Sequence, residues 1–180
     1  MKQLAVANIL LIFFILPNFM NAQSKPLVPD DFNVPDKLEN EYFTIRMLMV
    51  NDVVKDYDAV MTSIEHLHRM FPSSSWPSAD LTLEQDLIDL GWHQKEFQKR
   101  SSFAYTVVAN DESRVLGCLY IDPTNNDDFD AEIYMWVRES EFAKGLDSIL
   151  FNSVKEWINK DWPFKRVAYP GRTIKWEDWE

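Results

Sequence analysis

Two carboxylates stand where apolar segments begin or end, and these residues are well placed to move a proton. Asp122 follows the apolar run from Val115 to Ile121, and Glu132 stands near the start of the alternating segment from Ala131 to Val137. A carboxylate within hydrogen-bond reach of a substrate can act as a general base, directly or through a water molecule. Each acid also has a structural interpretation, in which Asp122 opens a turn and Glu132 faces solvent.

An aromatic residue close to further acids is a candidate for binding a substrate. Trp76 lies in a loop rich in serine and proline, and Asp80 and Glu84 follow it closely. Negative charge at the mouth of a site suits a cationic amine. In the alternative interpretation, Trp76 anchors the loop and the two acids solvate a helix.

The patterns that predict a metal site or a nucleophile are not found in the sequence. His66 and His68 are two residues apart on an expected helix, so their side chains point in different directions, and His93 stands alone. Residues 125–130 are rich in Asn and Asp but lack the glycine and the closing glutamate of an EF-hand loop. Cys118 lies inside an apolar run, which predicts a buried and unreactive thiol.

Two helices are expected before these strands, and both begin at capping residues. Asn51 or Asp52 can cap a helix that runs to about Met70. Thr82, with Gln85 three residues later, resembles a capping box for a helix over residues 83–99. Apolar residues at helical spacing predict the buried faces: Val53, Tyr57, Val60, Ile64, Leu67 and Phe71 on the first helix, and Leu83, Leu87, Leu90 and Phe97 on the second.

Short apolar segments predict the strands of a sheet. Residues 41–46, 103–109, 115–121, 131–137 and 166–169 alternate or are continuously apolar, and residues 145–159 predict a helix between the last two strands. The order is β-α-α-β-β-β-α-β, and a right-handed crossover makes the closing strand parallel to the strand before it. We therefore expect a single α/β domain whose mixed, mostly antiparallel sheet is flanked by helices.

Composition and charge exclude several classes of protein. The 180 residues are 46% hydrophobic and 14% aromatic, which is enough to bury the core of one domain. The formal net charge of −11 repels phosphate backbones, so we expect no nucleic-acid partner. A single cysteine excludes an intramolecular disulfide.

Residues 1–22 are typical of a secretory signal peptide, with one cation, an apolar run and a cleavage site expected after Ala22. The run is shorter than the roughly 20 residues of a membrane span, so we expect no stable span after cleavage. A start at Met20 is the alternative. Residues 23–41 contain three prolines and predict an extended tether or a loosely docked arm, and the folded domain is expected over residues 42–180.

The order of elements, with LGCLYIDP leading into DAEIYMWVRESEFAKGLDSILFNSVKEWI, resembles the Gcn5-related N-acetyltransferase (GNAT) superfamily. The resemblance covers residues 42–169 and rests mainly on the strand, turn and helix over residues 137–150. It implies an acyl-CoA N-acyltransferase domain with acetyl-CoA as co-substrate. In that family the strand ends at a splayed opening, and N–H groups at the next helix start hold the pyrophosphate, because a helix N-terminus carries free donors and partial positive charge.

The phosphate-binding turn of the family is matched only in part. Its pattern is Arg or Gln, two residues, Gly, one residue, then Gly or Ala. Here Gly145 matches, whereas Phe142 replaces the polar first residue and Asp147 brings negative charge to the place where phosphate approaches. The resemblance makes the N–H groups of Gly145 and Leu146 the expected phosphate donors, with Lys144 as the nearest cation. Alternatively, Asp147 caps its own helix without any ligand.

The resemblance also implies roles in catalysis. On the family's fold Asp122 and Glu132 lie beside the splayed opening, where either could take the proton of the amine, and a backbone N–H near Val137 would donate to the thioester oxygen. The family usually continues into a helix that often carries a tyrosine acid. Here Tyr169 is the candidate substitute, with simple packing as its alternative. The tail after Pro170 contains two tryptophans and is expected to cover the sheet edge.

The function that these observations predict is transfer of an acetyl group from acetyl-CoA to an amine acceptor, by direct attack with general-base assistance. The acceptor is a small molecule or a protein amine. The alternative is an exported, non-catalytic domain of the same fold that binds a ligand or a partner. Acetyl-CoA is made and kept in the cytosol. Cleavage after Ala22 predicts a periplasmic or secreted protein, whereas a start at Met20 predicts a cytoplasmic one.

Overall fold

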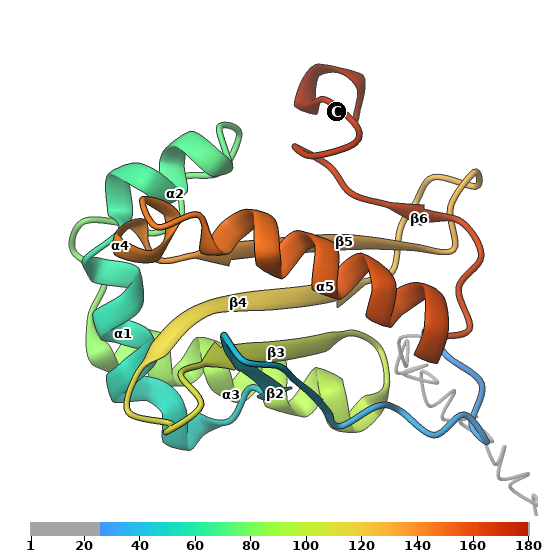
Figure 1. Ribbon diagram of the computed structural model, residues 1–180, viewed down its shortest axis with the longest axis horizontal. Helices are drawn as coiled ribbons and strands as arrows, with labels where there is room; N and C mark the ends of the chain where they lie inside the picture. Colours follow the sequence, from blue (N-terminus) through green and yellow to red (C-terminus); the bar gives the residue numbers. More distant parts are fainter. Residues whose placement is uncertain (1–25, 180) are drawn as a thin grey trace, which may run out of the picture.

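A six-stranded sheet with helices on both faces forms the part of the chain that the computed structural model describes, residues 26–179 (Figure 1). The expected signal peptide, residues 1–22, lies outside the described residues. The described helices include none that is long and apolar enough to cross a membrane.

The strands follow one another across the sheet in chain order. All neighbours are antiparallel except the last two, β5 and β6, which are parallel as the crossover predicts. The strands β3, β4 and β5 lie within one residue of their expected ranges. The full set is β1 (Lys37–Glu39), β2 (Thr44–Met47), β3 (Phe103–Val108), β4 (Val115–Asp122), β5 (Ala131–Val137) and β6 (Val167–Ala168).

Helices cover the two faces unequally. Figure 1 shows α5 lying across one face of the sheet, while α1, α2 and α3 lie on the other side. A short helix, α4, precedes α5 and was not expected from the sequence. The bounds are α1 (Val53–Met61), α2 (Ile64–Met70), α3 (Leu83–Lys99), α4 (Glu139–Phe142) and α5 (Leu146–Asp161), with short 3-10 turns at Val50–Asp52 and Trp176–Asp178.

The sheet separates two hydrophobic cores because its side chains alternate between its faces. On the α5 side, residues of β3 to β5 pack against the inward face of α5, including Leu150, Val154 and Trp157. On the α3 side, Trp136 and Cys118 pack with Val60, Leu67 and Leu90 from the helices. The fully buried Cys118 lies where the apolar run predicts it.

The described part of the expected tether belongs to the domain, which corrects the prediction of a loose arm over residues 23–41. Residues 37–39 form β1 and pair with β2. Val28 is buried in the α5-side core, and the hydroxyl of Tyr105 donates a hydrogen bond to the carbonyl of Pro35 at 2.6 Å. A few separated apolar residues suffice to dock this segment, although they show no periodicity that a sequence could reveal.

The first expected helix is two helices, because the chain turns at Thr62 and Ser63. The Thr62 hydroxyl donates to the carbonyl of Asp58 at 2.6 Å, and the N–H of Ser63 donates to the carbonyl of Val60 at 2.9 Å. Hydroxyl side chains compete in this way with regular helical bonding. The break lets α2 turn toward α4, where the Ser63 hydroxyl accepts the N–H of Glu139.

The helix α3 has the predicted bounds but a different buried face. Its capping box is confirmed, with the Thr82 hydroxyl accepting the N–H of Gln85 at 3.2 Å and the Gln85 side chain accepting the N–H of Thr82 at 2.8 Å. Leu83 and Leu87, expected inside, are each 43% exposed, whereas Leu90 is buried together with the carboxylate Asp86. The helix is therefore rotated so that one acid faces α1 and two leucines face solvent.

Candidate functional site

The free edge of β5 is the central feature of the site. β6 pairs with β5 only at two positions, Ala131 with Val167 and Glu132 with Ala168. Beyond Ala168 the chain turns away from β5, as Figure 1 shows. Among the described residues, the segment Ile133–Val137 therefore has no strand partner on this side, which leaves an opening between the two parallel strands.

Three cross-strand pairs line the α3-facing side of β4 and β5. In the register of these strands Asp122 lies opposite Glu132, Tyr120 opposite Tyr134, and Cys118 opposite Trp136. Alternation places all six side chains on the same face. The two acids singled out in the sequence are thus brought together, next to a pair of tyrosines.

Asp122 is the more perturbed of the two acids. Burial raises its pKa to about 7, with further contributions from the negative charges of Glu132 and Glu96. Glu132 accepts a hydrogen bond from the hydroxyl of Tyr134 at 3.0 Å, and burial raises the pKa of that tyrosine to about 12. A carboxyl group that titrates near neutrality and faces a cavity has the properties of a general base.

The cavity beside these residues has a volume of about 360 Å³. Aromatic rings dominate its walls, and Asp89, Asp122 and His93 are its titratable members other than tyrosine. Trp76 is among the lining residues, as the sequence suggested, whereas Asp80 and Glu84 are exposed and lie outside that set. The lining residues are Phe71, Ser74, Trp76, Asp89, His93, Tyr120, Asp122, Tyr134 and Trp136.

The turn that joins β5 to α5 begins with α4 and ends at Gly145. Gly145 has a φ of 84° and open space where a side chain would lie, but its N–H already donates to the carbonyl of Phe142 at 2.9 Å. Lys144 forms an ion pair with Glu141 at 3.0 Å. The N–H of Leu146, the first residue of α5, was also expected to bind phosphate. It donates no hydrogen bond among the described residues.

Asp147 and Arg172 form a partly buried ion pair between the start of α5 and the tail. The two guanidinium nitrogens donate to the two carboxylate oxygens, each at 2.7 Å, and both side chains are about 15% exposed. The same guanidinium donates to the carbonyl of Met135 at 3.1 Å, on the free edge of β5. Asp147 therefore does not simply cap its helix. It binds a cation that occupies the opening.

The last carbonyl of β5 has an intramolecular partner as well. Nε2 of His66 lies 3.1 Å from the carbonyl oxygen of Val137, so the ring donates there. Burial lowers the pKa of His66, which disfavours the charged form of the ring. The ring of Phe142 packs against it at 4.6 Å between centroids. Phe142, which departs from the family pattern, thus fixes the end of the strand through His66.

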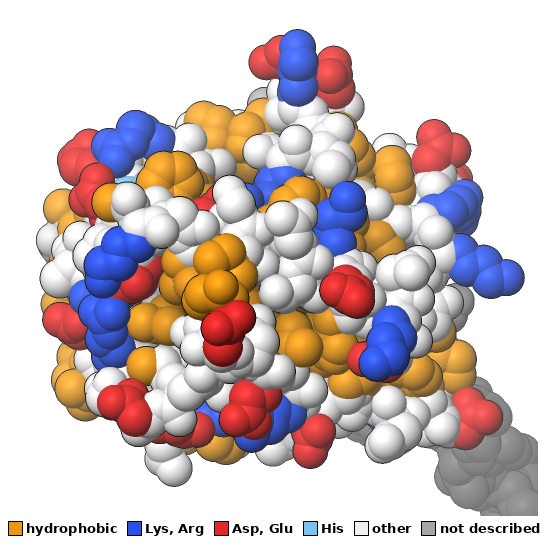
Figure 2. All heavy atoms as spheres, in the orientation of Figure 1, with side chains coloured by type: hydrophobic (Ala, Val, Ile, Leu, Met, Phe, Trp, Pro, Cys, Tyr) orange, Lys and Arg blue, Asp and Glu red, His pale blue; other side chains and the backbone are white. Residues whose placement is uncertain are grey.

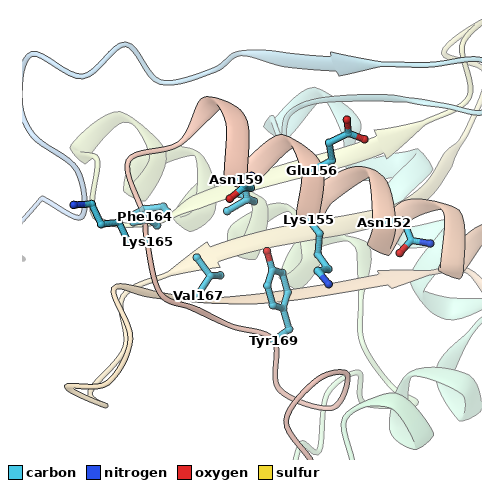
Figure 3. Close-up of a pocket in the computed structure, with 9 residues that line it drawn as sticks. Asn152, Lys155, Glu156, Asn159, Phe164, Lys165, Val167 and Tyr169 are labelled. Carbon is cyan, nitrogen blue, oxygen red and sulfur yellow. The ribbon is translucent and has the colours of Figure 1, made fainter.

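Tyr169 lies on the other face of the sheet from Asp122. It lines a cavity of about 520 Å³ between α5 and β6, where its hydroxyl points toward α5 and Lys155 approaches it from the helix (Figure 3). Its ring packs edge-on against Phe151 at 5.5 Å. Burial raises its pKa to about 12. This environment is that of a packing residue, which is the alternative stated for Tyr169.

The tail was expected to cover the edge of the sheet, and it contacts that edge through Arg172 while its two tryptophans pack on Tyr134, on the α3-facing side of β5. The indole of Trp176 stacks on Tyr134 at 6.1 Å and donates to the carbonyl of Met70 at 3.1 Å. The indole N–H of Trp179 donates to the hydroxyl of Tyr134 at 3.3 Å. The tail therefore holds one wall of the aromatic cavity in place. Among the described residues, no group of three or more His, Cys, Asp and Glu is arranged to hold a metal ion.

The arrangement of elements is shared with solved structures. The ribosomal-protein-S5-alanine acetyltransferase from Vibrio fischeri has a TM-score of 0.57, with 19% identity over 70% of this chain and 68% of its own. An acetyltransferase of the GNAT family from Bacillus anthracis has a TM-score of 0.54, with 16% identity over 74% of this chain and 72% of its own. This chain has the GNAT fold. The sequence itself matches no protein-family model and no curated protein.

A third solved structure shares the fold. The microcin C7 self-immunity acetyltransferase MccE, solved in complex with acetyl-CoA and AMP, also shares the fold, with a TM-score of 0.57, 12% identity, and coverage of 72% of this chain and 69% of its own. β5 and α5 are the strand and the helix on which the resemblance to the family mainly rests. At these identities the comparison establishes the fold, and activity must be argued from the site.

Several residues of the site were not identified from the sequence. Tyr120 and Tyr134 could have been found, since strand alternation places them on the same face as Asp122 and Glu132. Phe71 and His93 come from the helical layer, and Arg172 from the tail. These three reach the site through long-range packing, for which a single sequence carries no local signal.

Proposed function

We propose that this chain transfers an acetyl group from acetyl-CoA to an amine that enters the aromatic cavity. The observation that carries the proposal is the carboxyl group of Asp122, which faces that cavity at the end of β4 with a pKa of about 7. The cavity adjoins the strand β5, whose other edge is the opening of a GNAT fold. Asp122 can accept a proton on one side of β5, and acetyl-CoA would enter on the other. This arrangement suits acyl transfer.

The reaction requires a neutral amine, although amines are protonated at neutral pH. In our proposal Asp122 accepts one proton from the ammonium group, and the nitrogen lone pair then forms the new bond to the carbonyl carbon. Acetyl-CoA supplies the acetyl group as a thioester. Its C–S bond breaks as the amide forms, and the nitrogen gives its second proton to the departing thiolate, so CoA leaves as the thiol. The carboxylate of Glu132 accepts a hydrogen bond from the hydroxyl of Tyr134 at 3.0 Å. In our proposal Glu132 therefore does not take the proton itself, and its negative charge helps to raise the pKa of Asp122.

The backbone around the opening suits acetyl-CoA, whereas its charged side chains do so only after a rearrangement. The N–H of Leu146 and the space at Gly145 would receive the pyrophosphate, and the free edge near Met135 and Val137 would receive the extended arm. Lys144 is exposed, so leaving Glu141 costs it little. The pair of Asp147 with Arg172 must separate first, since the guanidinium now holds the Met135 carbonyl.

That same ion pair favours a second candidate function, a non-catalytic domain that binds a ligand in the aromatic cavity. Separating this partly exposed, bidentate pair carries a cost, because both charged groups lose their partner. If acetyl-CoA does not meet that cost, the opening stays closed by the tail and the cavity acts alone.

Calorimetric titration of acetyl-CoA and of CoA into the full chain, together with a CoA-release assay on a panel of amines, separates these functions. We expect a Kd in the micromolar range, about −8 kcal/mol, and CoA release that falls about 10²-fold in Asp122→Asn. Asp80→Asn, at an exposed acid outside the cavity, is the matched control. Absence of both binding up to millimolar concentration and CoA release would support the non-catalytic domain.

The compartment belongs to the proposal too. We propose export with cleavage after Ala22, and a cytoplasmic protein starting at Met20 is the alternative. N-terminal sequencing of the protein recovered from cell fractions distinguishes them. Export with bound acetyl-CoA would require a supply of the co-substrate outside the cytosol, whereas export without binding agrees with the non-catalytic function.

A further inference from the structure

The outer face of α3 exposes large apolar side chains to solvent. Ile88 is 56% exposed and Trp92 is 55% exposed, and the two lie about one helical turn apart on this face. Single exposed apolar residues are ordinary, whereas a cluster of them marks an interaction surface. Within residues 26–179, five of the seven large apolar side chains that are exposed belong to α1 or α3: Val54, Leu83, Leu87, Ile88 and Trp92.

The helix α1 extends this apolar face. The N–H of Val50, just before α1, donates to the side chain of Gln94 near the end of α3 at 3.0 Å. The hydroxyl of Tyr57, on α1, donates to the carbonyl of Leu81, just before α3, at 2.9 Å. The two helices therefore run antiparallel, and Val54, which lies between Val50 and Tyr57, is level with the middle of α3. The exposed apolar surface thus spans both helices.

Charged side chains of opposite sign stand at the two ends of this face. Positions 84, 88, 92, 95 and 99 recur at helical spacing, so they share the outer side of α3. Glu84 lies at the N-terminal end of this row, Lys95 and Lys99 lie toward its C-terminal end, and all three are exposed. None of the three forms an ion pair within residues 26–179. The ammonium group of Lys95 lies over the ring of Trp92, 4.1 Å from its centroid.

The order of charges along this face makes it complementary to a second copy of itself. Figure 2 shows the α5 side of the molecule, where acidic and basic side chains are interspersed over the surface. On the outer face of α3, the apolar residues Ile88 and Trp92 separate an acidic end from a basic end. When such a face meets a copy of itself in the reverse direction, each acidic end lies against a basic end.

We infer that the chain forms a symmetric dimer in which the outer faces of α3 from two copies pack antiparallel. In this dimer Ile88 of each copy contacts Trp92 of the other, and these side chains leave water together. Glu84 of each copy lies near Lys95 and Lys99 of the other, and the two-fold axis repeats this contact at both ends. A parallel arrangement would instead bring like charges together at both ends, which is repulsive.

The dimer does not depend on acetyl transfer, so it goes beyond the proposed function. Each copy carries a formal net charge of −11, but salt at physiological concentration screens charges that lie more than about 8 Å apart, so the contacts at the interface decide. The helix α3 also carries Asp89 and His93, which line the aromatic cavity. A second copy seated on α3 therefore holds this wall of the cavity in place.

Sedimentation equilibrium of the full chain over a range of concentrations tests the inference. We expect a reversible dimer with a Kd in the micromolar range. Trp92→Ala should raise this Kd about 30-fold, because buried aromatic residues carry much of the binding energy of an interface. Tyr42→Ala, at an exposed aromatic residue before β2 and outside this face, is the matched control and should leave the Kd unchanged.

Exchange of the charges gives a test that a self-complementary face alone can pass. Glu84→Lys makes both ends of the face basic, and the double variant Lys95→Glu/Lys99→Glu makes both ends acidic. Each variant alone should be monomeric at concentrations where the unmodified chain is a dimer. A mixture of the two should form a heterodimer, because it restores both opposite-charge contacts. Glu156→Lys and Lys160→Glu, at exposed charges of α5, are the controls and should dimerise like the unmodified chain.

Three results would each overturn the inference. An unmodified chain that stays monomeric would leave this face to a different partner. A dimer that is unaffected by Trp92→Ala and by the charge variants would place the contact on another part of the chain. A mixture of the two charge variants that stays monomeric, although circular dichroism shows both to be folded, would contradict the antiparallel arrangement.

Discussion

At the scale of single residues, the structure separates two acids that the sequence leaves equivalent. Asp122 and Glu132 lie opposite each other on neighbouring strands. Asp122 lines the cavity, whereas Glu132 accepts a hydrogen bond from the hydroxyl of Tyr134. The negative charge of Glu132 helps to raise the pKa of Asp122. Asp122 is therefore the group that titrates near neutral pH, and Glu132 is a group that sets its pKa.

The pH profile of the reaction should report Asp122. A base must be ionised to accept a proton, so kcat/KM should rise with pH and level off above about pH 7, the pKa of the carboxyl group. In Asp122→Asn this rising limb of the pH profile should vanish, and kcat/KM should fall about 10²-fold. Glu132→Gln removes a neighbouring negative charge, so its limb should move to lower pH. A limb that persists unchanged in Asp122→Asn would assign the titration to another group.

The sequence could predict the strand residues of the site but not its partners from other layers. The acids at the strand ends and Trp76 in its loop were identified from type and position, and Trp76 does line the cavity. Asp80 and Glu84 were chosen by proximity in sequence to Trp76, and the chain carries them outward instead. Arg172 meets Asp147 across 25 positions of the chain, a pairing that depends on how the tail folds back.

At the scale of elements, the start of α5 carries its own anion. The first turn of a helix attracts negative charge, and here the Asp147 carboxylate lies in that turn with Arg172 as its counter-ion. The bidentate geometry of this pair is also the geometry with which arginine binds phosphate. In the function that we propose, Arg172 obstructs the opening while it is paired with Asp147, and it would be free to bind phosphate if Asp147 were removed.

A double-mutant cycle tests this role of the pair. Asp147→Gly should tighten binding of CoA by about tenfold to hundredfold, because it removes a repulsive charge and frees Arg172 to bind phosphate. Adding Arg172→Ala to Asp147→Gly should remove most of that gain. Lys175→Ala, an exposed cation of the same tail, is the control. Calorimetry with CoA measures each variant, and an unchanged Kd in Asp147→Gly would show that Asp147 is no impediment.

The boundaries of the elements were predicted best where a local signal sets them. The capping box of Thr82 and Gln85 fixes the start of α3, whereas the rotation of α3 depends on packing against α1. Leucine spacing suggested an inward face with Leu83 and Leu87, yet the buried face includes Asp86 and Leu90. The hydrophobic pattern fails here because the carboxylate Asp86 points into the protein, and this turns Leu83 and Leu87 toward solvent.

Loss of the cap should measurably destabilise the protein. Thr82→Ala removes the acceptor for the N–H of Gln85, which should lower the free energy of unfolding by about 1 kcal/mol. Thr173→Ala, an exposed threonine of the tail, should change it by less than about 0.5 kcal/mol. Urea denaturation followed by circular dichroism compares the two variants. Equal effects would mean that the capping box contributes nothing specific.

At the scale of the whole molecule, several acids are buried on the α3 side of the sheet. Burial raises the pKa of Asp56 to about 7 and that of Asp86 to about 6, and Asp122 titrates in the same range. The thiol of Cys118 donates to Asp56 at 3.3 Å, so this carboxyl group has a partner but, within residues 26–179, no counter-ion. Ionising such groups in the folded protein carries an energetic cost that unfolding would relieve.

Stability should therefore fall as the pH rises from about 4 to about 7, because these carboxyl groups bind their protons more tightly when folded than when unfolded. Below about pH 4 the sign reverses, since acids such as Asp130, paired with Arg166 and with a pKa of about 2, lose their pairing. Asp56→Asn should flatten the slope between pH 4 and 7 and raise Tm at pH 8, whereas Asp80→Asn, at an exposed acid, should leave both unchanged. Calorimetric Tm values across this range measure the effect. If Tm in Asp56→Asn falls with pH as steeply as in the unmodified protein, the pH dependence must come from Asp86 and Asp122 instead.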